Sequence, residues 1–503
     1  MMNALDRNLL SALIFAPVVG ALAVALVPRR LARVHKLVGV ATAGAVFLLS
    51  LRAVALFQAR TGMQLEVRRD WLPSYGISYH LGIDGLSLWL VVLTALLTPL
   101  ALLGSWRGIE TRVREFQIFT LLSEAGMLGV FCSLDLVLFY VFWEAMLVPM
   151  YFLIGIWGHE RRIYAAVKFF LFTMAGSVVM LVAFLVLYFA SGHATFDLPR
   201  LLETPVGPGL QMWLFAAFGL AFAIKVPLVP LHTWLPDAHV EAPTAGSVLL
   251  AGVLLKMGVY GFLRLAIPLF PVAAARFAPW IALLAVIGIV YGALVALVQT
   301  DMKKLVAYSS VSHLGFVMLG VAALTPTAVV GSVYQMLNHG VSTGALFLLV
   351  GMLYERRHTR EIAEFGGLKS VMPRFAAVFL LIGLSSMAVP GFNGFVGEFL
   401  ILMGAWSLGW GYVAVAALGV ILAAAYILWM IQRVFHGEVT NPKNAALPDL
   451  SLREMSVIIP LVVLALLMGI ASPLITRTIE PSASQMVYDA QTRAHAPAKG
   501  AAR

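Results

Sequence analysis

Apolar runs of about 20 residues recur along almost the whole sequence, and no other feature constrains the fold as strongly. We count about fourteen such runs, each long enough to cross the hydrocarbon core of a bilayer as a helix. Inside a bilayer the backbone must satisfy its own hydrogen bonds, so spanning runs of this length fold as helices. The sequence therefore predicts an all-α polytopic membrane protein with about 14 transmembrane helices.

The composition excludes several other classes of protein. Hydrophobic residues make up 61% of the 503 residues and charged residues only 12%, whereas about half of a soluble protein is apolar. The net charge of +10 comes mainly from basic residues between apolar runs, which orient membrane helices, so we expect no nucleic acid as a partner. With one cysteine, Cys132, the chain forms no internal disulfide and holds no iron–sulfur cluster alone.

Motifs for cofactors and metals are equally sparse. No glycine-rich dinucleotide or ATP motif is present, so we expect no cofactor in this chain and any redox centre in another one. His232 and His239 lack partners at the spacing of metal ligands, and we expect no metal site there.

Basic residues lie in alternate connections between the apolar runs. The first run, residues 9–27, is followed by four of them: Arg29, Arg30, Arg33 and Lys36. Because cytoplasmic connections carry the excess of Lys and Arg, the pattern predicts that both termini lie outside. After the second run, a longer polar connection passes through Arg68, Arg69 and Asp70. The tail after Pro481 is expected to be a disordered end or a contact for a neighbour.

Residues 214–255 contain an unusual stretch for a membrane helix. Lys225 lies deep in an apolar run, Pro227 and Pro230 then break that run, and Lys256 lies in the middle of the next one. A charge at the centre of a span costs about 2.5–3.5 kcal/mol, so such residues pair with one another or line a wet path. A broken helix beside a buried cation is how many transporters build an ion site.

A weak internal repeat surrounds two proline breaks. Residues 219–227, GLAFAIKVP, align with one gap on residues 383–390, GLSSMAVP. Two broken helices in two halves of a chain are typical of transporter repeats, although so short a match also arises by chance.

Six ionisable residues lie at similar depth in separate apolar runs. They are Glu144, Lys225, Lys256, His313, His339 and Glu398. Unpaired, they would cost on the order of 10 kcal/mol together, which favours a working relay over packing groups. A buried lysine holds its proton while a carboxylate is close and releases it when the pair separates, and histidine titrates near neutrality. For each histidine alone, a structural role is an equally good interpretation.

Eight further polar residues lie nearer the predicted helix ends. Their side chains are candidates for entrance funnels, and interfacial capping is the alternative for each. They are Asp84, Glu124, Asp135, Lys168, His232, Asp237, His239 and Glu241.

Several long motifs occur in order along the chain. They are GIDGLSLWLVVLTALLTPL, LVLFYVFWEAMLVPMYFLIGIWG, KVPLVPLHTWLPDAHVEAPTAGSVLLAGVLLKMGVYG, KKLVAYSSVSHLGFV and VPGFNGFVGEFLIL. With these motifs the sequence resembles, over nearly its whole length, the antiporter-like subunits of proton-pumping NADH:quinone oxidoreductase, respiratory complex I. Glu398 resembles the M-type branch of that family, whereas the L- and N-type branches tend to have lysine there.

The resemblance implies a single membrane domain, residues 1–503, with one broken helix in each of two inverted five-helix repeats. The implied parts are N-terminal helices in 1–110, a first repeat in 111–270, a second repeat in 277–437, a last helix in 454–476 and a polar tail in 481–503.

The resemblance also implies roles. Glu144 and Lys225 would gate a first half-channel, Lys256 would carry the proton at the centre, and Glu398 would be the terminal group beyond His313 and His339. NADH, FMN, iron–sulfur clusters and quinone would belong to partner subunits, and L- and N-type subunits would be neighbours. The location implied is a bacterial inner (plasma) membrane, with both termini periplasmic.

Two alternatives remain at this point. A subunit of a multisubunit cation/proton antiporter or of a membrane-bound hydrogenase would have much the same channel residues. A structural scaffold without transport would become more stable, with no loss of function, once its buried charges were neutralised.

Overall fold

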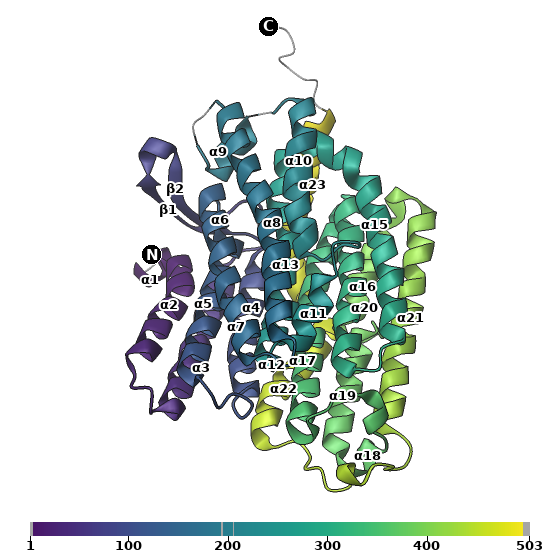
Figure 1. The fold of residues 1–503 in the computed structure, drawn as a ribbon. Helices are drawn as coiled ribbons and strands as arrows, with labels where there is room; N and C mark the ends of the chain where they lie inside the picture. Colours follow the sequence, from purple (N-terminus) through teal and green to yellow (C-terminus); the bar gives the residue numbers. More distant parts are fainter. Residues whose placement is uncertain (1–3, 193–194, 205, 496–503) are drawn as a thin grey trace.

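The computed structural model describes residues 4–192, 195–204 and 206–495 as a bundle of helices (Figure 1). Within these residues, 12 helices are long and apolar enough to cross a membrane. Shorter apolar helices at 88–104, 373–386 and 393–408 lie among them. The predicted all-α polytopic fold is confirmed, while the count of about 14 spans and the division into inverted repeats stay predictions.

The N-terminal part pairs helices with a small hairpin. Its elements are α1 (Ala4–Arg7), α2 (Leu9–Leu26), α3 (Ala32–Leu56), β1 (Gln64–Leu72), η1 (Pro73–Tyr75), β2 (Ile77–Ile83) and α4 (Leu88–Gly104). β1 and β2 pair antiparallel, with Arg69 opposite Tyr79. The polar connection predicted around Arg69 thus contains a hairpin, which the sequence analysis did not predict. Three consecutive charged residues at 68–70 interrupt the alternation of apolar and polar residues in β1, so the sequence pattern does not predict a strand.

The middle of the chain contains the first broken helix. Its elements are α5 (Val113–Cys132), α6 (Leu136–Ala145), α7 (Leu147–Trp157), α8 (Arg162–Ala190), α9 (Leu198–Glu203), α10 (Pro208–Lys225), α11 (Trp234–Glu241), α12 (Thr244–Leu249), η2 (Leu250–Leu254), α13 (Leu255–Gly261), η3 (Phe262–Ala266) and α14 (Ile267–Leu269). η2 and η3 are π-helical turns on either side of Lys256.

The last part contains the second broken helix. Its elements are α15 (Pro271–Leu297), α16 (Met302–Ala323), α17 (Pro326–Arg357), η4 (Ile362–Glu364), α18 (Leu368–Val371), α19 (Pro373–Ser386), α20 (Asn393–Ala405), η5 (Trp406–Leu408), α21 (Trp410–Phe435), η6 (Pro442–Asn444), α22 (Leu452–Ile470) and α23 (Pro473–His495).

Both predicted proline breaks are present. α10 ends at Lys225, and helix resumes at Trp234, whose indole nitrogen donates to the carbonyl of Ile224 at 2.9 Å. α19 ends at Ser386 and α20 begins at Asn393, with Pro390 between them. Buried side chains such as Trp234 thus satisfy carbonyls that each break leaves open.

A third interruption was not predicted. The apolar run at 136–157, long enough for one span, is divided at Met146, between α6 and α7. This point lies directly after Glu144, so the carboxylate sits at the end of a helix segment rather than inside a regular helix. Pro149, three residues farther on, cannot donate to the preceding turn, which accounts for the loss of regular hydrogen bonding here.

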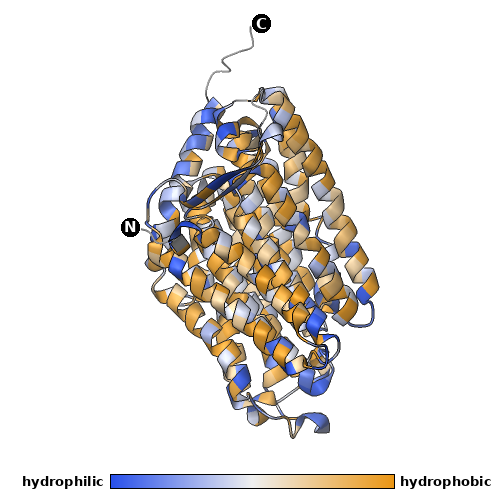
Figure 2. Ribbon diagram, turned by 90° about the vertical axis from the view of Figure 1, so that its left-hand side faces the viewer, coloured by the Kyte–Doolittle hydropathy of each residue, from blue (hydrophilic) through white to orange (hydrophobic). Residues whose placement is uncertain are grey.

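The centre of the bundle is formed by three helices that barely meet the surface. In the most apolar stretch of Thr244–Leu269 and of α17, every residue is buried, and in that of α16 94% of the residues are. In the corresponding stretch of α3 only 28% are buried. Hydrophobic residues cover the body of the ribbon, and hydrophilic residues gather mainly toward its ends (Figure 2). Polar groups on the three central helices are therefore shielded from lipid.

The C-terminal segment differs from the expected disordered end. α23 runs through Pro481 to His495 and packs against α15 and α17. Its buried residues recur at helical spacing: Ile475, Ile479, Ala483, Met486, Val487 and Ala490. The disordered-end prediction is wrong for 481–495, because small and apolar residues at this period make one packing face. Residues 496–503 lie outside the described part.

Candidate proton path

Lys225 and Glu144 are buried close enough to interact electrostatically, and no hydrogen bond or ion pair joins them in the described chain. Lys225, the last residue of α10, is 1% exposed, and its ammonium group has no hydrogen-bond partner among the described residues. The ammonium lies 5.2 Å from the ring centre of Trp143 and 5.6 Å from that of Phe169. Glu144 is close enough to act on it electrostatically, yet Oε1 of Glu144 is itself buried and unpartnered. The two charges are thus near each other without a bond.

Lys256, by contrast, makes hydrogen bonds to a histidine and to a backbone carbonyl. Its Nζ contacts Nδ1 of His339 at 2.6 Å and donates to the carbonyl of Ala251. η2 places this side chain, since a π-turn shifts the register of the helix just before Lys256. Gly252 and Gly340 allow the two helices to approach, because a Cβ at Gly340 would lie 3.0 Å from the Gly252 carbonyl.

The path continues from His339 to Glu398. The rings of His339 and His313 are 6.0 Å apart, and Nδ1 of His313 lies 2.9 Å from Oε1 of Glu398. All three side chains are buried, and Nε2 of His339 has no partner within the described chain. The structure thus brings Lys256, His339, His313 and Glu398 into one line and places the Glu144–Lys225 pair apart from it.

An amide network holds Glu398. Gln335 donates from Nε2 to Oε1 of Glu398 at 3.0 Å, and Asn338 donates to Oε1 of Gln335 at 2.9 Å. Gly397 is required at this contact, since a Cβ there would lie 2.3 Å from the Gln335 oxygen. Oε2 of Glu398 stays buried without a partner in the described part, whereas Oε1 holds the contacts with Gln335 and His313.

Sequence reasoning missed several residues of this site. Gln335, Asn338 and Tyr426 were not singled out, although the first two precede His339 by four and one positions in one apolar helix. The hydroxyl of Tyr426 lies 3.3 Å from Nε2 of His313. Polar side chains inside an apolar run were the available signal for all three.

His239 lies deeper than its place in the sequence suggested. It is fully buried, stacks on Phe347 at 4.7 Å, and both ring nitrogens lack partners among the described residues. Lys256 and Lys303 both act on it electrostatically. α11 carries it inward after the first break, so a residue expected near a helix end joins the core.

The other residues expected near helix ends have varied surroundings. Asp135 caps α6 by accepting from the backbone of Val137 and Leu138, as the capping alternative predicts. Burial raises the pKa of its carboxyl, although these hydrogen bonds act in the opposite direction. The carboxylate of Glu124 is fully buried and interacts with the hydroxyl of Thr98. Three more take part in polar contacts: Lys168 with Asp237 at 2.7 Å, and Glu241 with the backbone of Arg161 at 2.9 Å.

At the charged end of the bundle His159 closes the turn between α7 and α8. Its backbone donates to the carbonyl of Glu241 at 2.9 Å. Burial, and then the charges of Lys303 and Arg360, lower its pKa to about 3, so the ring is neutral at physiological pH. No group of three or more His, Cys, Asp or Glu side chains within the described residues is placed to hold a metal ion.

Known proteins share both the sequence and the fold. Residues 133–423 match the family model described as NADH:quinone oxidoreductase/Mrp antiporter, TM. NADH-quinone oxidoreductase subunit M of Rhodobacter capsulatus is 46% identical over 501 residues, covering 96% of this chain and 97% of that protein. NADH-ubiquinone oxidoreductase chain 4 of Arabidopsis thaliana is 44% identical, with 95% and 97% covered.

A solved structure agrees with this relationship. A chain of respiratory complex I from Thermus thermophilus superposes with a TM-score of 0.88 at 38% identity, covering 96% of this chain and 99% of that one. The sequence motifs, the two broken helices and these similarities all point to the same family, and the relatives match nearly the whole chain. The chain belongs to the family of antiporter-like membrane subunits shared by NADH:quinone oxidoreductases and Mrp antiporters.

Proposed function

We propose that this chain is a proton-translocating, M-type membrane-arm subunit of NADH:quinone oxidoreductase. The observation that carries the proposal is the buried line from Lys256 through His339 and His313 to Glu398. Its four titratable groups form two hydrogen-bonded pairs whose histidine rings lie 6.0 Å apart, an arrangement in an apolar core that suits proton transfer. NADH, FMN, iron–sulfur clusters and quinone belong to partner subunits, and electron transfer there drives the protons here.

The transfer proceeds from bond to bond. A proton leaves Nζ of Lys256 for Nδ1 of His339 across 2.6 Å, while the neutral amine stays behind. The imidazolium then gives up a proton to His313, and a bridging water or a ring rotation closes the 6.0 Å between the rings. His313 passes a proton from Nδ1 to Oε1 of Glu398 at 2.9 Å, which neutralises the carboxylate.

Glu144 and Lys225 gate the loading of this line. While the carboxylate is near, it favours the ammonium form of Lys225, and its withdrawal favours release of the proton. The interruption at Met146 gives the segment with Glu144 a point at which to move. His239 is buried within electrostatic range of Lys256, and we infer that it takes part in proton transfer toward that lysine.

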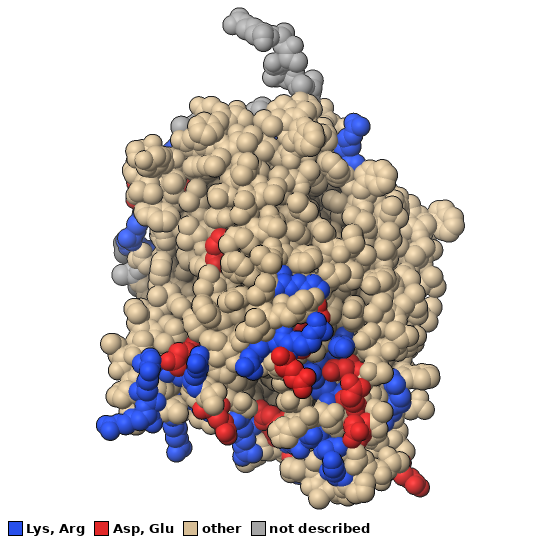
Figure 3. Space-filling model, viewed as in Figure 1, with Lys and Arg blue, Asp and Glu red and all other residues tan. Residues whose placement is uncertain are grey.

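Charge distribution supports the orientation that we propose. Lys and Arg gather, together with acidic residues, at the lower end of the molecule in Figure 3. By the positive-inside rule this end lies in the cytoplasm of a bacterium, with the chain in the inner (plasma) membrane and both termini periplasmic. Exposed apolar side chains on the flanks meet lipid or the L- and N-type subunits of the complex.

The first test is Glu398→Gln, which keeps the hydrogen-bonding shape but removes the titratable oxygen. Proton pumping and NADH:quinone turnover are measured in the same membranes, after assembly is confirmed on a native gel. We expect assembled complex with pumping or turnover severely reduced. The matched control is Glu438→Gln, an exposed carboxylate in the loop after α21. Unchanged pumping in assembled Glu398→Gln would mean that Glu398 is a packing group.

A second candidate follows from the family itself, whose description includes Mrp antiporters. In that case the same line of residues would exchange protons for another cation without electron transfer. Co-purification decides between them, because the first function requires NADH-oxidising subunits in the same complex.

A further inference from the structure

A polar column leads from Lys256 toward the opposite end of the helix. Tyr260 follows Lys256 by four residues in α13, and Arg264 follows by four more in η3, so all three lie on one side of a buried helix. Nε of Arg264 donates to the hydroxyl of Tyr260 at 3.1 Å, and that hydroxyl donates to the carbonyl of Phe131 at 3.0 Å. About 12 Å along the helix axis separate Lys256 from Arg264.

A cavity meets the end of this column. It has a volume of about 260 Å³ and is lined by Asp84 and Arg264 together with residues from the outer loops and α23, among them Met63, Leu198, Gln485 and Asp489. This volume is roughly that of nine liquid waters. The cavity is large enough to hold water, and it ends at Arg264, about two helical turns from Lys256.

An ion pair closes the cavity on the side of Lys256. Arg264 bonds Oδ1 of Asp84, and their side chains are only 8% and 7% exposed. Asp84 is itself fixed at the start of α4, where its carboxylate accepts from the backbone of Leu86 at 3.0 Å. α23 supports the same turn, because Ser482 accepts from the backbone of Gly85 at 2.9 Å.

We propose that Arg264 and Asp84, braced by Tyr260, form the outer proton barrier above Lys256. A guanidinium keeps its charge in proteins, so Arg264 cannot relay a proton and repels one that approaches through the cavity. Asp84 holds this charge in place. The barrier stops protons from returning along the column to Lys256, and so keeps the pump from short-circuiting. The role rests on the proposed function of Lys256.

The test uses the assembled complex in sealed vesicles that carry Arg264→Met, which keeps the length of the side chain and removes its charge. After an acid pulse on the periplasmic face without NADH, we expect passive proton uptake to be severalfold faster than in wild type. With NADH, we expect electron transfer to continue while the proton gradient falls. Adding Lys256→Met should abolish the leak, because the leak passes through that lysine.

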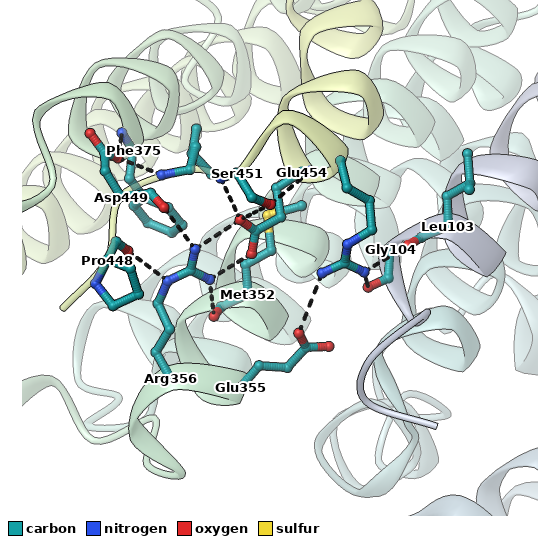
Figure 4. A network of polar contacts seen from close by, with 12 residues as sticks. Leu103, Gly104, Met352, Glu355, Arg356, Phe375, Pro448, Asp449, Ser451 and Glu454 are labelled. Carbon is teal, nitrogen blue, oxygen red and sulfur yellow. Dashed lines mark hydrogen bonds and ion pairs between the residues drawn. The ribbon is translucent and has the colours of Figure 1, made fainter. Parts of the chain in front are cut away.

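The matched control is Arg356→Met. Arg356 makes an equally buried ion pair with Glu454, with side chains 10% and 5% exposed, at the opposite end of the bundle (Figure 4). The network there ties α17 to α22 and to Pro448 and Asp449, and no column leads from it to Lys256 along α13. We expect this variant to keep the membrane tight.

Several outcomes would overturn the barrier. If assembled Arg264→Met takes up protons at the wild-type rate, the ion pair is only a structural contact. If the leak persists when Lys256→Met is added, the protons follow a route that does not include Lys256. If Arg264→Met does not assemble, Asp84→Asn and Tyr260→Phe decide in its place, and tight membranes with both would refute the barrier. Failure of the proposed function is distinct, since it appears as normal pumping with Glu398→Gln whether or not Arg264→Met leaks.

Discussion

Lys225 and Lys256 occupy chemically different sites although both are buried lysines in apolar helices. Lys225 ends a helix among aromatic rings with no hydrogen bond in the described chain, whereas Lys256 contacts His339 at 2.6 Å. Burial and depth of both could be predicted from the sequence. The resemblance implied the pairing of Lys225 with Glu144, but the contact between Lys256 and Nδ1 of His339 could not be predicted. It depends on the π-turn at 250–254, which no local pattern records.

The difference predicts the effect of Lys225→Ala. Because the ammonium makes no hydrogen bond in the described chain, its removal leaves no polar partner unsatisfied, so we expect the complex to assemble on a native gel. We also expect most quinone-linked pumping to disappear, because the ammonium charge that interacts with Glu144 is lost. Glu144→Ala should give the same result, since either change removes the pair. Full pumping in both variants would contradict the gating role.

At the scale of elements, the two proline breaks were predictable and the hairpin β1–β2 was not. A proline in an apolar run marks a break directly in the sequence. The strand β1 leaves no continuous alternating pattern, because four of its nine residues are charged and three of these are consecutive. The hairpin is held by tertiary contacts instead. His80 bonds Asp197 at 2.6 Å and Glu66 at 3.2 Å, and Arg68 reaches the other oxygen of Asp197 at 3.3 Å.

These contacts predict a pH dependence outside the membrane. Burial alone lowers the pKa of His80, but Asp197 and Glu66 outweigh it and raise the pKa above its ordinary value of 6.5. The charged ring therefore stabilises the docked hairpin below pH 6.5, and this contribution is lost as the pH rises through the raised pKa. Hydrogen exchange, corrected for its intrinsic rate, should speed up in the hairpin as the buffer becomes alkaline.

His80→Gln is the control for that measurement. Glutamine keeps a hydrogen bond to Asp197 but cannot take a charge, so we expect the pH dependence of exchange to flatten. Identical pH profiles for the wild type and His80→Gln would assign the effect to another group.

At the scale of the whole molecule, α23 shows why composition alone misled the sequence analysis. A polar, alanine-rich tail reads as a disordered end, yet its apolar residues form a single stripe that covers α15 and α17. A stripe of this kind folds only where a groove receives it, and the groove is made by helices more than a hundred residues earlier.

That packing predicts unequal effects along α23. Ala483 is fully buried against the bundle, so Ala483→Asp places an unpaired charge in an apolar contact and should cost several kcal/mol of stability. Tyr488 is 67% exposed, and Tyr488→Asp should change stability little. Thermal unfolding of the purified complex, followed by loss of pumping, measures both. Equal melting temperatures would mean that α23 is not anchored by this stripe.

The line from Lys256 to Glu398 also determines where the membrane potential acts. Lys256, His339 and His313 each lie near the middle of their spans, and Glu398 follows the break in the middle of its own. A proton passing between them crosses from helix to helix at nearly constant depth and so does almost no work against the field. The cost of about 2.3 kcal/mol per 100 mV therefore falls on the vertical steps at either end. Voltage should slow proton loading and release and leave the lateral transfers untouched.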